Sequence, residues 1–484
     1  SNLTIGLVMV GPYNDRGWSQ ANYEGMQYVL AKVPGTKLVY IDKANSADRP
    51  GTTVSQLAES LVAQGAKLIC FSSDDMMDEA VKFATAHPDI FVIMTTGDQQ
   101  WKEGKAYKPL ANMINIMGKM EYTKMIAGVA AALTTKTGQI GYLGPLINDE
   151  TRRLAASVYL GAKYAWVNYL KKDPAQLKFR VTWIGFWFNI PGVTADPTQV
   201  ADEFFNSGCD VVVSGIDTTE AVAEAAKFTA QGKKVWAIPY DYSKAMDEGK
   251  GVSLGVPYFN WGPAYARTVK EAMNGTWKAH FEWNDPDWKN INNPDTSAVG
   301  FVKGNLSKEA SEGVDKFIDE LAKGLNLWTG ALNLQDGSVY LKKGEAFPDD
   351  AALVILPGSK STIADRIEFT RNGWDEGLRN HVSRGGQVIG ICGGYQMLGR
   401  RIADPDGIEG EVRQIEGLGL LNVETVLAGE KTVRNSEPQL AANGLPLSGY
   451  EIHMGRTDGP DCLRPMIDTV HGPDGAISAD GRVM

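Results

Sequence analysis

The chain has 484 residues, of which 43% are hydrophobic and 22% are charged. This composition excludes a largely disordered protein, and the length predicts at least two domains. The formal net charge of −10 excludes a broad basic surface that could hold nucleic acid. The apolar stretches, such as residues 125–133, are far shorter than the roughly 20 residues that a membrane-spanning helix needs.

The four cysteines and five histidines give no sign of a disulfide framework or a metal centre. The cysteines lie far apart and form no CxxC pair, which argues against a disulfide scaffold and against a zinc site. Five histidines are few for a metalloenzyme. We therefore expect neither a metal nor a cofactor. The cysteines are Cys70, Cys209, Cys392 and Cys462.

The first 347 residues alternate between β-rich apolar runs and stretches with helical periodicity. Strands that alternate with helices predict βαβ units and doubly wound parallel sheets, so the expected class is α/β. Two such runs, residues 3–112 and 118–250, each have the size of one lobe. The predicted strands are residues 3–10, 37–41, 67–71, 89–95, 138–143, 179–184, 210–214 and 234–238. The predicted helices are residues 51–64, 75–86, 119–133, 150–170, 196–207 and 217–231.

Aromatic and polar residues follow the predicted strands, where ligands of parallel sheets bind. Rings from two facing lobes suit a planar heterocycle by stacking, and Asp or Asn at its edge accepts hydrogen bonds from ring N–H groups. Each aromatic residue alone is also consistent with core or lobe packing, but the set favours a ligand cleft. No catalytic motif is found in this part. The candidate ligand-binding residues are Tyr13, Asn14, Trp18, Trp187, Phe188, Asp217, Asp241 and Trp261.

The last part of the chain carries a candidate nucleophile. Residues 352–362 predict a buried strand that leads into a glycine-containing loop, and residues 385–399 predict a strand, a sharp turn at Cys392 and a helix. Glycines on both sides of Cys392 are typical of a nucleophile elbow, which presents the thiol at a helix N-terminus. Main-chain N–H groups at Gly358 and Gly393 are then candidates for an oxyanion hole. The alternative is a buried structural cysteine in a glycine-rich turn.

A change in composition separates these two parts. Residues 1–350 contain 29 Lys and 6 Arg, whereas residues 351–484 contain 2 Lys and 11 Arg. Of the twelve tryptophans, only Trp374 lies after residue 350. Both cations are charged at neutral pH, so folding does not demand this change. We interpret the chain as a fusion, or chimera, of two coding sequences with separate histories.

Several segments of the first part resemble the basic membrane protein family, which comprises substrate-binding lipoproteins of ABC importers similar to purine nucleoside receptors. They are GPYNDRGWSQANYEGMQ at 11–27, KTGQIGYLGP at 136–145, the WFN–PGV loop within 185–193, NWGPAYARTVKEAMNGTWK at 260–278 and DGSVYLKKGE at 336–345.

The resemblance implies a two-lobe periplasmic-binding fold of type I over residues 1–347, which closes on a purine base or nucleoside. The expected lobes are residues 1–117 with 251–280, and residues 118–250 with 281–347. The implied partner is an ABC transporter permease, and the implied location is periplasmic, or extracytoplasmic and membrane-anchored. Trp18-Ser19 stands where the nucleoside receptors have a Phe/Asn pair, which favours a free base or another flat ring.

Residues 348–484 form the second expected domain, which resembles the glutamine amidotransferase domain of cobyric acid synthase. The matching segments are LPGSKSTIAD, GWDEGL, ICGGYQMLGRRIADPDGIEG, GLGLLNVET and GYEIHMGRT. By this resemblance Cys392 is the nucleophile that hydrolyses glutamine in the cytoplasm, and the ammonia serves an ATP-dependent amidation of a corrinoid in cobalamin synthesis.

The expected activity of this domain in the present chain is low. The family's ATP-binding domain and a phosphate loop are not found, and the family's catalytic histidine is expected beyond Met484, which leaves His453 as the substitute. Ser1-Asn2 is interpreted as a tag remnant on a mature protein whose export signal was removed. Three functions therefore remain: a solute receptor with an inactive amidotransferase fragment, a Cys-dependent glutamine amidotransferase, or an interaction module that uses the fused pair.

Overall fold

The computed structural model describes residues 2–104, 106–249, 251–328, 332–333, 339–340, 347, 351–359 and 361–484, without the side chains of 332–333, 339–340, 430–435, 450 and 452. The chain divides into two compact units, Ser1–Leu327 and Trp328–Met484. The predicted boundary at residue 347 falls in a stretch that lies mostly outside the described residues. No helix in the described part of the chain is long and apolar enough to cross a membrane.

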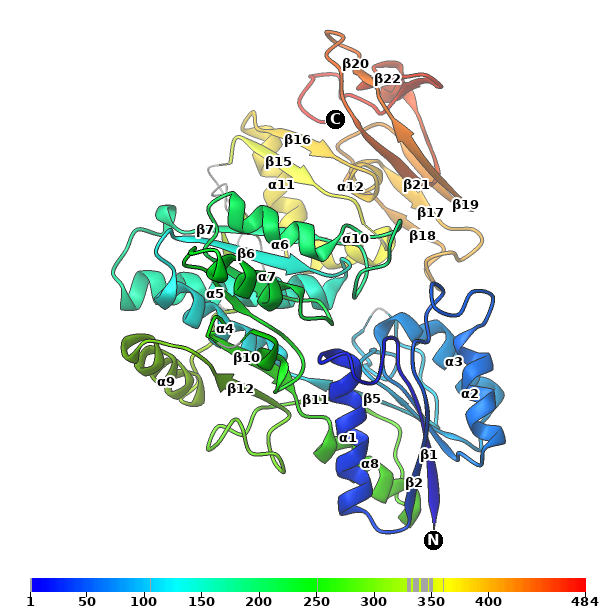
Figure 1. The fold of residues 1–484 in the computed structure, drawn as a ribbon. Helices are drawn as coiled ribbons and strands as arrows, with labels where there is room; N and C mark the ends of the chain where they lie inside the picture. The colour runs from blue at the N-terminus through cyan, green and yellow to red at the C-terminus, as the bar shows by residue number, and fades with distance from the viewer. Residues whose placement is uncertain are drawn as a thin grey trace. The chain divides into compact units, whose positions relative to one another are not determined.

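The first lobe of the first unit is built on a six-stranded parallel sheet in the order β11-β5-β4-β3-β1-β2. The inner strands β1, β3, β4 and β5 are largely buried, which explains their continuous apolar sequences. Leu7 and Cys70 join one core with α1 and α8, whereas Val8 and Ile69 join another with α2 and α3 (Figure 1). The elements are β1 (Leu3–Val8), α1 (Trp18–Lys32), β2 (Thr36–Ile41), α2 (Val54–Ala63), β3 (Leu68–Phe71), α3 (Met77–Ala86), β4 (Phe91–Met94), β5 (Met113–Gly118), α8 (Gly262–Asn274) and β11 (Phe281–Asn284).

The second lobe contains a four-stranded parallel sheet in the order β7-β6-β8-β9 and an antiparallel pair, β10 with β12. The strands β6, β8 and β9 are largely buried. The elements are α4 (Met120–Thr134), β6 (Gln139–Gly144), α5 (Asp149–Tyr164), β7 (Lys178–Trp183), α6 (Pro197–Asn206), β8 (Val211–Ser214), α7 (Glu220–Ala230), β9 (Trp236–Ile238), β10 (Gly255–Phe259), β12 (Val299–Lys303) and α9 (Lys308–Ala322). The predicted α/β class with parallel sheets is confirmed.

The strand pairing differs from the predicted lobe ranges at two short strands. The strand β10, which lies within the range 251–280 expected in the first lobe, pairs with β12 of the second lobe. The strand β11, which lies within the range 281–347 expected in the second lobe, pairs with β5 of the first lobe. The chain therefore crosses between the lobes after β5, after β10 and after β11. Both strands have only four or five residues, and so short a run does not reveal its distant partner.

The second unit contains a parallel pair, β15 with β16, beside the helices α10, α11 and α12, and a four-stranded sheet in the order β18-β17-β19-β21. Val483 bridges to Val388 of β16, so the last described residues extend the β15–β16 pair. The elements are β13 (Leu332–Asn333), β14 (Val339–Tyr340), β15 (Leu353–Leu356), α10 (Thr362–Arg371), α11 (Trp374–Ser383), β16 (Gln387–Gly390), α12 (Gly393–Leu398), β17 (Arg401–Ala403), β18 (Gln414–Glu416), β19 (Glu424–Ser436), β20 (Gln439–Leu440), β21 (Gly449–Asp458), β22 (Ile467–Thr469) and β23 (Gly472–Asp474).

Candidate functional site

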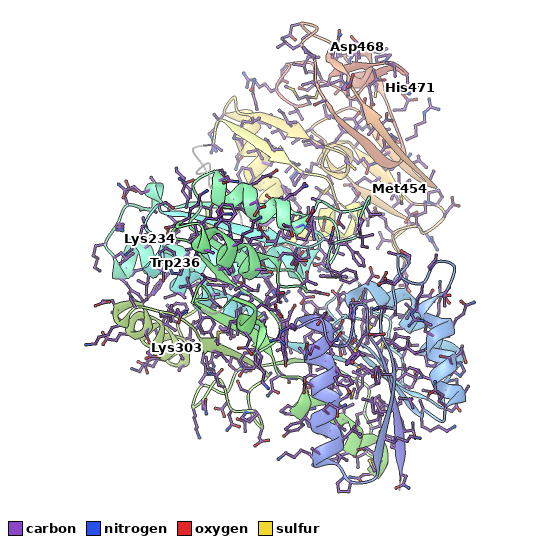
Figure 2. The ribbon with its side chains drawn as sticks, in the orientation of Figure 1. Lys234, Trp236, Lys303, Met454, Asp468 and His471 are labelled. Atoms are coloured by element: carbon purple, nitrogen blue, oxygen red, sulfur yellow. The ribbon has the colours of Figure 1, made fainter. Side chains whose placement is uncertain are left out.

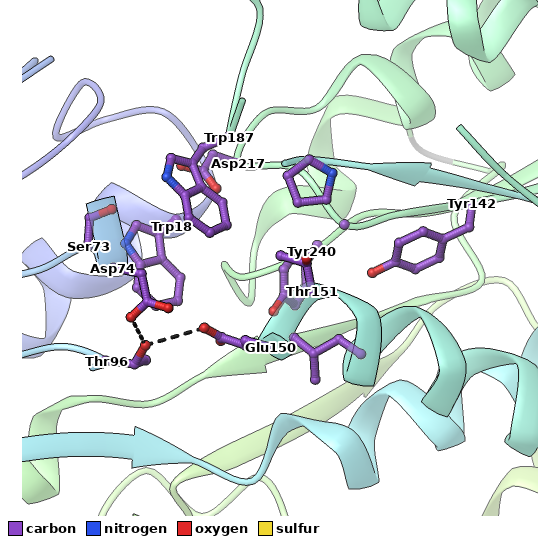
Figure 3. Close-up of a pocket in the computed structure, with 13 residues that line it drawn as sticks. Trp18, Ser73, Asp74, Thr96, Tyr142, Glu150, Thr151, Trp187, Asp217 and Tyr240 are labelled. Atoms are coloured by element: carbon purple, nitrogen blue, oxygen red, sulfur yellow. Dashed lines mark hydrogen bonds between the residues drawn. The ribbon is translucent and has the colours of Figure 1, made fainter. Parts of the chain in front are cut away.

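A pocket lies between the two lobes of the first unit, next to the carboxyl ends of strands from both sheets. Its empty space is about 440 Å³, including the part that is open to solvent. Loops after β3, β4, β6 and β8 and the first turns of α1 and α5 supply its walls (Figure 3). The lining residues are Trp18, Ser73, Asp74, Thr96, Tyr142, Pro145, Glu150, Thr151, Leu154, Trp187, Gly215, Asp217 and Tyr240.

Two tryptophans form an aromatic side of the pocket, one from each lobe (Figure 3). Trp18 is the first residue of α1, and its Nε1–H donates to the carbonyl of Ser72 at 2.5 Å. Its ring meets the ring of Trp261 edge to face, with 5.5 Å between the centroids. Trp187 comes from the loop after β7, and its Nε1–H has no hydrogen-bond partner among the described residues. One indole is therefore fixed by the first lobe, and the other retains a donor for a ligand.

Two carboxyl groups compete for one hydroxyl on another side of the pocket. The hydroxyl of Thr96 contacts Asp74 and lies 3.3 Å from Oε2 of Glu150 (Figure 3). A hydroxyl donates only one hydrogen. Burial and the nearby Asp74 raise the pKa of Glu150 to about 8, so a proton on Glu150 relieves the repulsion between the two acids. The capping box of Asn148 and Thr151 fixes the first turn of α5 and thereby the position of Glu150.

Two further acids are buried at the site, and of these Asp217 lines the pocket whereas Asp241 does not. Asp217 follows β8, its side-chain Oδ2 has no hydrogen-bond partner among the described residues, and burial raises its pKa well above the ordinary value. Asp241 is fully buried, and both of its carboxyl oxygens likewise lack a described partner. Burial also raises the pKa of Asp241, which the nearby Lys124 opposes.

Lys124 of α4 is the cation within this group. Its Nζ donates to the carbonyl of Ser214 at 2.8 Å and lies 3.3 Å from the ring centroid of Tyr240. Burial lowers the pKa of Lys124 to about 7, although Asp241 favours its charged form. One lysine therefore faces more carboxyl groups than it can neutralise.

The two lobes contact each other at the mouth of the pocket. Arg16 of the first lobe forms ion pairs with Asp247 at 3.6 Å and Glu248 at 2.7 Å in the second. Gly17 lies so close to the carbonyl of Asp217 that a Cβ atom on Gly17 would come well within 3.0 Å of it. The structure therefore holds the lobes in a closed arrangement.

The structure brings together some of the predicted ligand-binding residues and separates others. Trp18, Trp187 and Asp217 line the pocket. Trp261 is buried behind Trp18 and stacks on Phe259, and Asp241 is buried beside Lys124.

The other three predicted residues do not line the pocket. The ring of Phe188 packs edge to face on Phe186. Tyr13 is exposed and contacts the rings of Tyr23 and Tyr40, and Asn14 is exposed. The loop turns these two side chains toward solvent because Asp15, between them and the helix, takes the inward position and accepts from the N–H groups of Gly17, Ser19 and Gln20.

Several lining residues were not among the predicted ones, although they lie next to predicted strands. Asp74 and Thr96 follow β3 and β4, and Glu150 follows β6 by one short loop. The sequence feature that could have identified these residues was their position directly after predicted strands. The remaining residues of this kind are Ser73, Tyr142, Pro145, Thr151, Leu154, Gly215 and Tyr240.

Cys392 occupies the sharp turn expected in the second unit. It lies between β16 and α12 and has a φ of +52°, which is unusual for a residue with a side chain. A Cβ on Gly393 or Gly394 would collide with the loop after β15, and a Cβ on Gly358 would lie 3.5 Å from the Cβ of Cys392. The predicted strand–turn–helix is confirmed, whereas the nucleophile and the oxyanion hole at Gly358 and Gly393 stay predictions.

His453, the expected substitute base, makes other contacts. It lies on β21, where Nδ1 is 3.2 Å from the carbonyl of Gly455 and Nε2 is 3.1 Å from Oε1 of Glu451. Both ring nitrogens thus face oxygen atoms of β21. His471 is exposed in the turn between β22 and β23 (Figure 2).

Each unit matches a known protein family. Residues 2–285, more than half of the chain, match the family described as ABC transporter substrate-binding protein PnrA-like. Residues 331–484 match the CobB/CobQ-like glutamine amidotransferase domain. Among solved structures, an ABC transporter solute-binding protein from Aeropyrum pernix K1 aligns with a TM-score of 0.53 and 12% identity, over 77% of this chain and 98% of that one. This likeness shows the fold alone.

Two curated relatives match the second unit. Cobyric acid synthase from Rhizobium meliloti (strain 1021) is 60% identical over 146 residues, and that from Sinorhizobium medicae (strain WSM419) is 62% identical over 146 residues. In both comparisons the matched segment is 30% of this chain and 30% of the relative. The chain therefore spans less than a third of the length of these relatives.

Proposed function

Because the chain belongs, through residues 2–285, to the PnrA-like family of ABC transporter substrate-binding proteins, we propose that its first unit is an extracytoplasmic solute receptor for a planar heterocycle. A purine base or a nucleoside fits the proposal best. The observation that carries it is the pair of indoles, Trp18 and Trp187, which face a closed pocket together with Asp217. An ABC permease is the proposed partner.

The pocket suits a flat ring for physical reasons. Indole faces stack on heterocycles, and such stacking is worth about 1–3 kcal/mol for each base in other proteins. Two further rings, those of Tyr142 and Tyr240, are buried and line the same pocket. The carboxyl group of Asp217 lies among these rings and accepts hydrogen bonds from ring N–H groups.

The first prediction is that calorimetry detects micromolar or tighter binding of at least one ligand among adenine, guanine, hypoxanthine and their nucleosides. Trp187→Ala should weaken that binding by about 1–3 kcal/mol, because it removes a stacking face. Trp101→Ala is the matched control, since Trp101 stacks on Phe281 of the first lobe and does not line the pocket. Absence of binding across this panel would show that the purine assignment is wrong.

A second candidate function, glutamine hydrolysis, is favoured by the elbow at Cys392 and by the family match of residues 331–484. A cysteine nucleophile needs a neighbouring base to form the thiolate and to protonate the leaving group. The contacts of His453 with Gly455 and Glu451 occupy the ring of the expected substitute. The proposal for this unit is therefore an amidotransferase-like domain with no useful glutaminase activity in the present chain.

The second prediction follows from this arrangement. Ammonia release from glutamine by the full chain should equal that of the Cys392→Ala variant, and His453→Ala should leave the rate unchanged. A coupled glutamate or ammonia assay measures the difference. A clear rate that disappears in Cys392→Ala would contradict the prediction and would show that another group serves as the base.

A further inference from the structure

The lining of the inter-lobe pocket contains acidic residues but no basic ones. Three of its thirteen residues are acidic, namely Asp74, Glu150 and Asp217, and none is Lys, Arg or His. Carboxylates that are removed from water are costly unless a cation or hydrogen-bond donors face them. If all three were ionised, the lining would carry more acceptor charge than it can satisfy, and burial accordingly raises the pKa of Glu150 and of Asp217.

The cations on the two neighbouring helices are engaged elsewhere. Lys124 of α4 donates to the carbonyl of Ser214. Arg153 of α5 is 3.7 Å from Glu121, and its guanidinium lies 4.8 Å from the ring centroid of Trp283. Neither residue lines the pocket. Asp74 already accepts from the N–H of Gly97 at 2.8 Å, so a ligand is the remaining source of a donor for the unpaired oxygen of Asp217.

Two buried polar atoms show what such a ligand must offer. Asp217 is 4% exposed, and its Oδ2 has no hydrogen-bond partner in the described part of the chain. The Nε1–H of Trp187 also lacks a partner there. An unpaired buried acceptor and an unpaired buried donor each cost free energy until they are satisfied. The complementary ligand carries an N–H donor for Asp217 and a ring-nitrogen or carbonyl acceptor for Trp187.

The contact of Thr96 with two acids points to a second donor. Its one hydroxyl hydrogen cannot serve both Asp74 and Glu150. The acid that does not receive this hydrogen needs either a proton shared between the two acids or an N–H group of the ligand. A ligand with N–H donors can therefore pair with Asp217 on one side of the pocket and with Glu150 on the other.

We propose that the pocket selects amino-substituted or cationic nitrogen heterocycles, whose N–H groups meet Glu150 and Asp217, and rejects anionic analogues that carry a phosphate or a carboxylate. This inference rests on the proposed function, because it names the class of ring that the receptor binds. A phosphate would bring a further negative charge against three carboxyl groups, and no lining cation would offset it.

Binding of this class is linked to proton release. In the free protein, Asp74 and burial favour the protonated form of Glu150, and Arg153 opposes them. The groups that face it from other elements are Tyr142, Asp217, Tyr240 and Asp241. A donor ligand prefers the ionised carboxylate and displaces the proton. Affinity should therefore rise with pH up to about 8, the pKa of the free Glu150, provided that the ligand keeps its own charge.

The test is calorimetry on the full chain with four kinds of probe: adenosine and the cationic 7-methylguanosine, neutral inosine, anionic AMP, and the non-aromatic guanidinium agmatine. We expect the first two to bind about 10- to 100-fold more tightly than inosine, the range for a hydrogen bond to a charged group. AMP should give no detectable heat. Titrations in phosphate and in Tris should differ in heat, because protons leave the protein on binding.

Variants separate this inference from the proposed function. Glu150→Gln should abolish the proton release. Asp217→Asn should remove most of the preference for the cationic ring. Asp75→Asn is the control, because Asp75 is the exposed neighbour of Asp74, and it should change neither the proton release nor the preference. Equal binding of AMP and adenosine, or an unchanged preference in both variants, would overturn the inference and leave ring binding intact. Binding of agmatine without any ring would overturn the proposed function and leave the donor requirement intact. Silence from every probe would overturn both.

Discussion

Replacement of Gly17 by Ala should weaken ligand binding by about 100-fold while the first unit stays folded, because the closed form becomes a minor population in the variant. Gly17 precedes α1 in the first lobe and lies against the carbonyl of Asp217 in the second. A methyl group there would come well within 3.0 Å of that oxygen, which is backbone and cannot rotate away. The lobes must therefore separate, and the indoles of Trp18 and Trp187 move apart with them.

The local fold should tolerate this change. The φ of Gly17 is −150°, so no left-handed conformation is lost when a Cβ is added. Gly11→Ala in the same loop is the matched control, since its Cβ would lie 3.3 Å from the hydroxyl of Ser19 and 3.5 Å from the ring of Phe188. Calorimetry gives the affinity, and small-angle scattering gives the shape with and without ligand. A variant at Gly17 that binds normally would show that closure at this contact is not required.

Much of the first unit could be predicted because its strands are buried on both faces. Runs such as those of β3 (Leu68–Phe71) and β8 (Val211–Ser214) are fully buried and continuously apolar, which is typical of parallel sheets. The strand β11 (Phe281–Asn284) is only half-buried, and its partner β5 lies far back in the sequence. No local pattern identifies such a partner, and the expected lobe ranges differ from the pairing for that reason.

The sequence predicts those residues of the candidate site that directly follow a strand or begin a helix. Trp18, Trp187 and Asp217 were found by their position at helix starts and after strands, and all three line the pocket. Glu150 was not, because an acid in the first turn of a helix is common on electrostatic grounds alone. Its special environment comes from burial and from Asp74, which belongs to the other lobe and is brought near only by the fold.

The sequence also does not reveal which side chains of a loop point toward the pocket. Tyr13 and Asn14 share a loop with Trp18, yet both are exposed. The inward position belongs to Asp15, whose carboxylate accepts from three backbone N–H groups at the start of α1. Burial raises the pKa of Asp15 to about 7. Aromatic residues in a predicted loop therefore identify the neighbourhood of a site more reliably than its lining.

The crossing of α4 and α5 gives the largest expected effect on stability. The two helices pack directly on each other, and a Cβ on Gly161 would come well within 3.0 Å of the backbone of Met125, as a Cβ on Gly128 would of the backbone of Val158. The same helices carry Lys124 and Glu150 to the site. The spacing of this helix pair therefore sets the distance between the buried lysine and the acids of the pocket.

Gly161→Ala should consequently lower the free energy of unfolding of the first unit by about 3 kcal/mol, at the upper end for overpacking, even though Ala favours a helix over Gly by about 1 kcal/mol. Gly313→Ala in α9 is the matched control. Its Cβ would meet only the end of the Leu133 side chain, which can rotate, so this variant should be neutral or more stable. Urea unfolding followed by tryptophan fluorescence measures both changes. Equal stabilities for the two variants would contradict the prediction, because helix propensity alone would then decide the outcome.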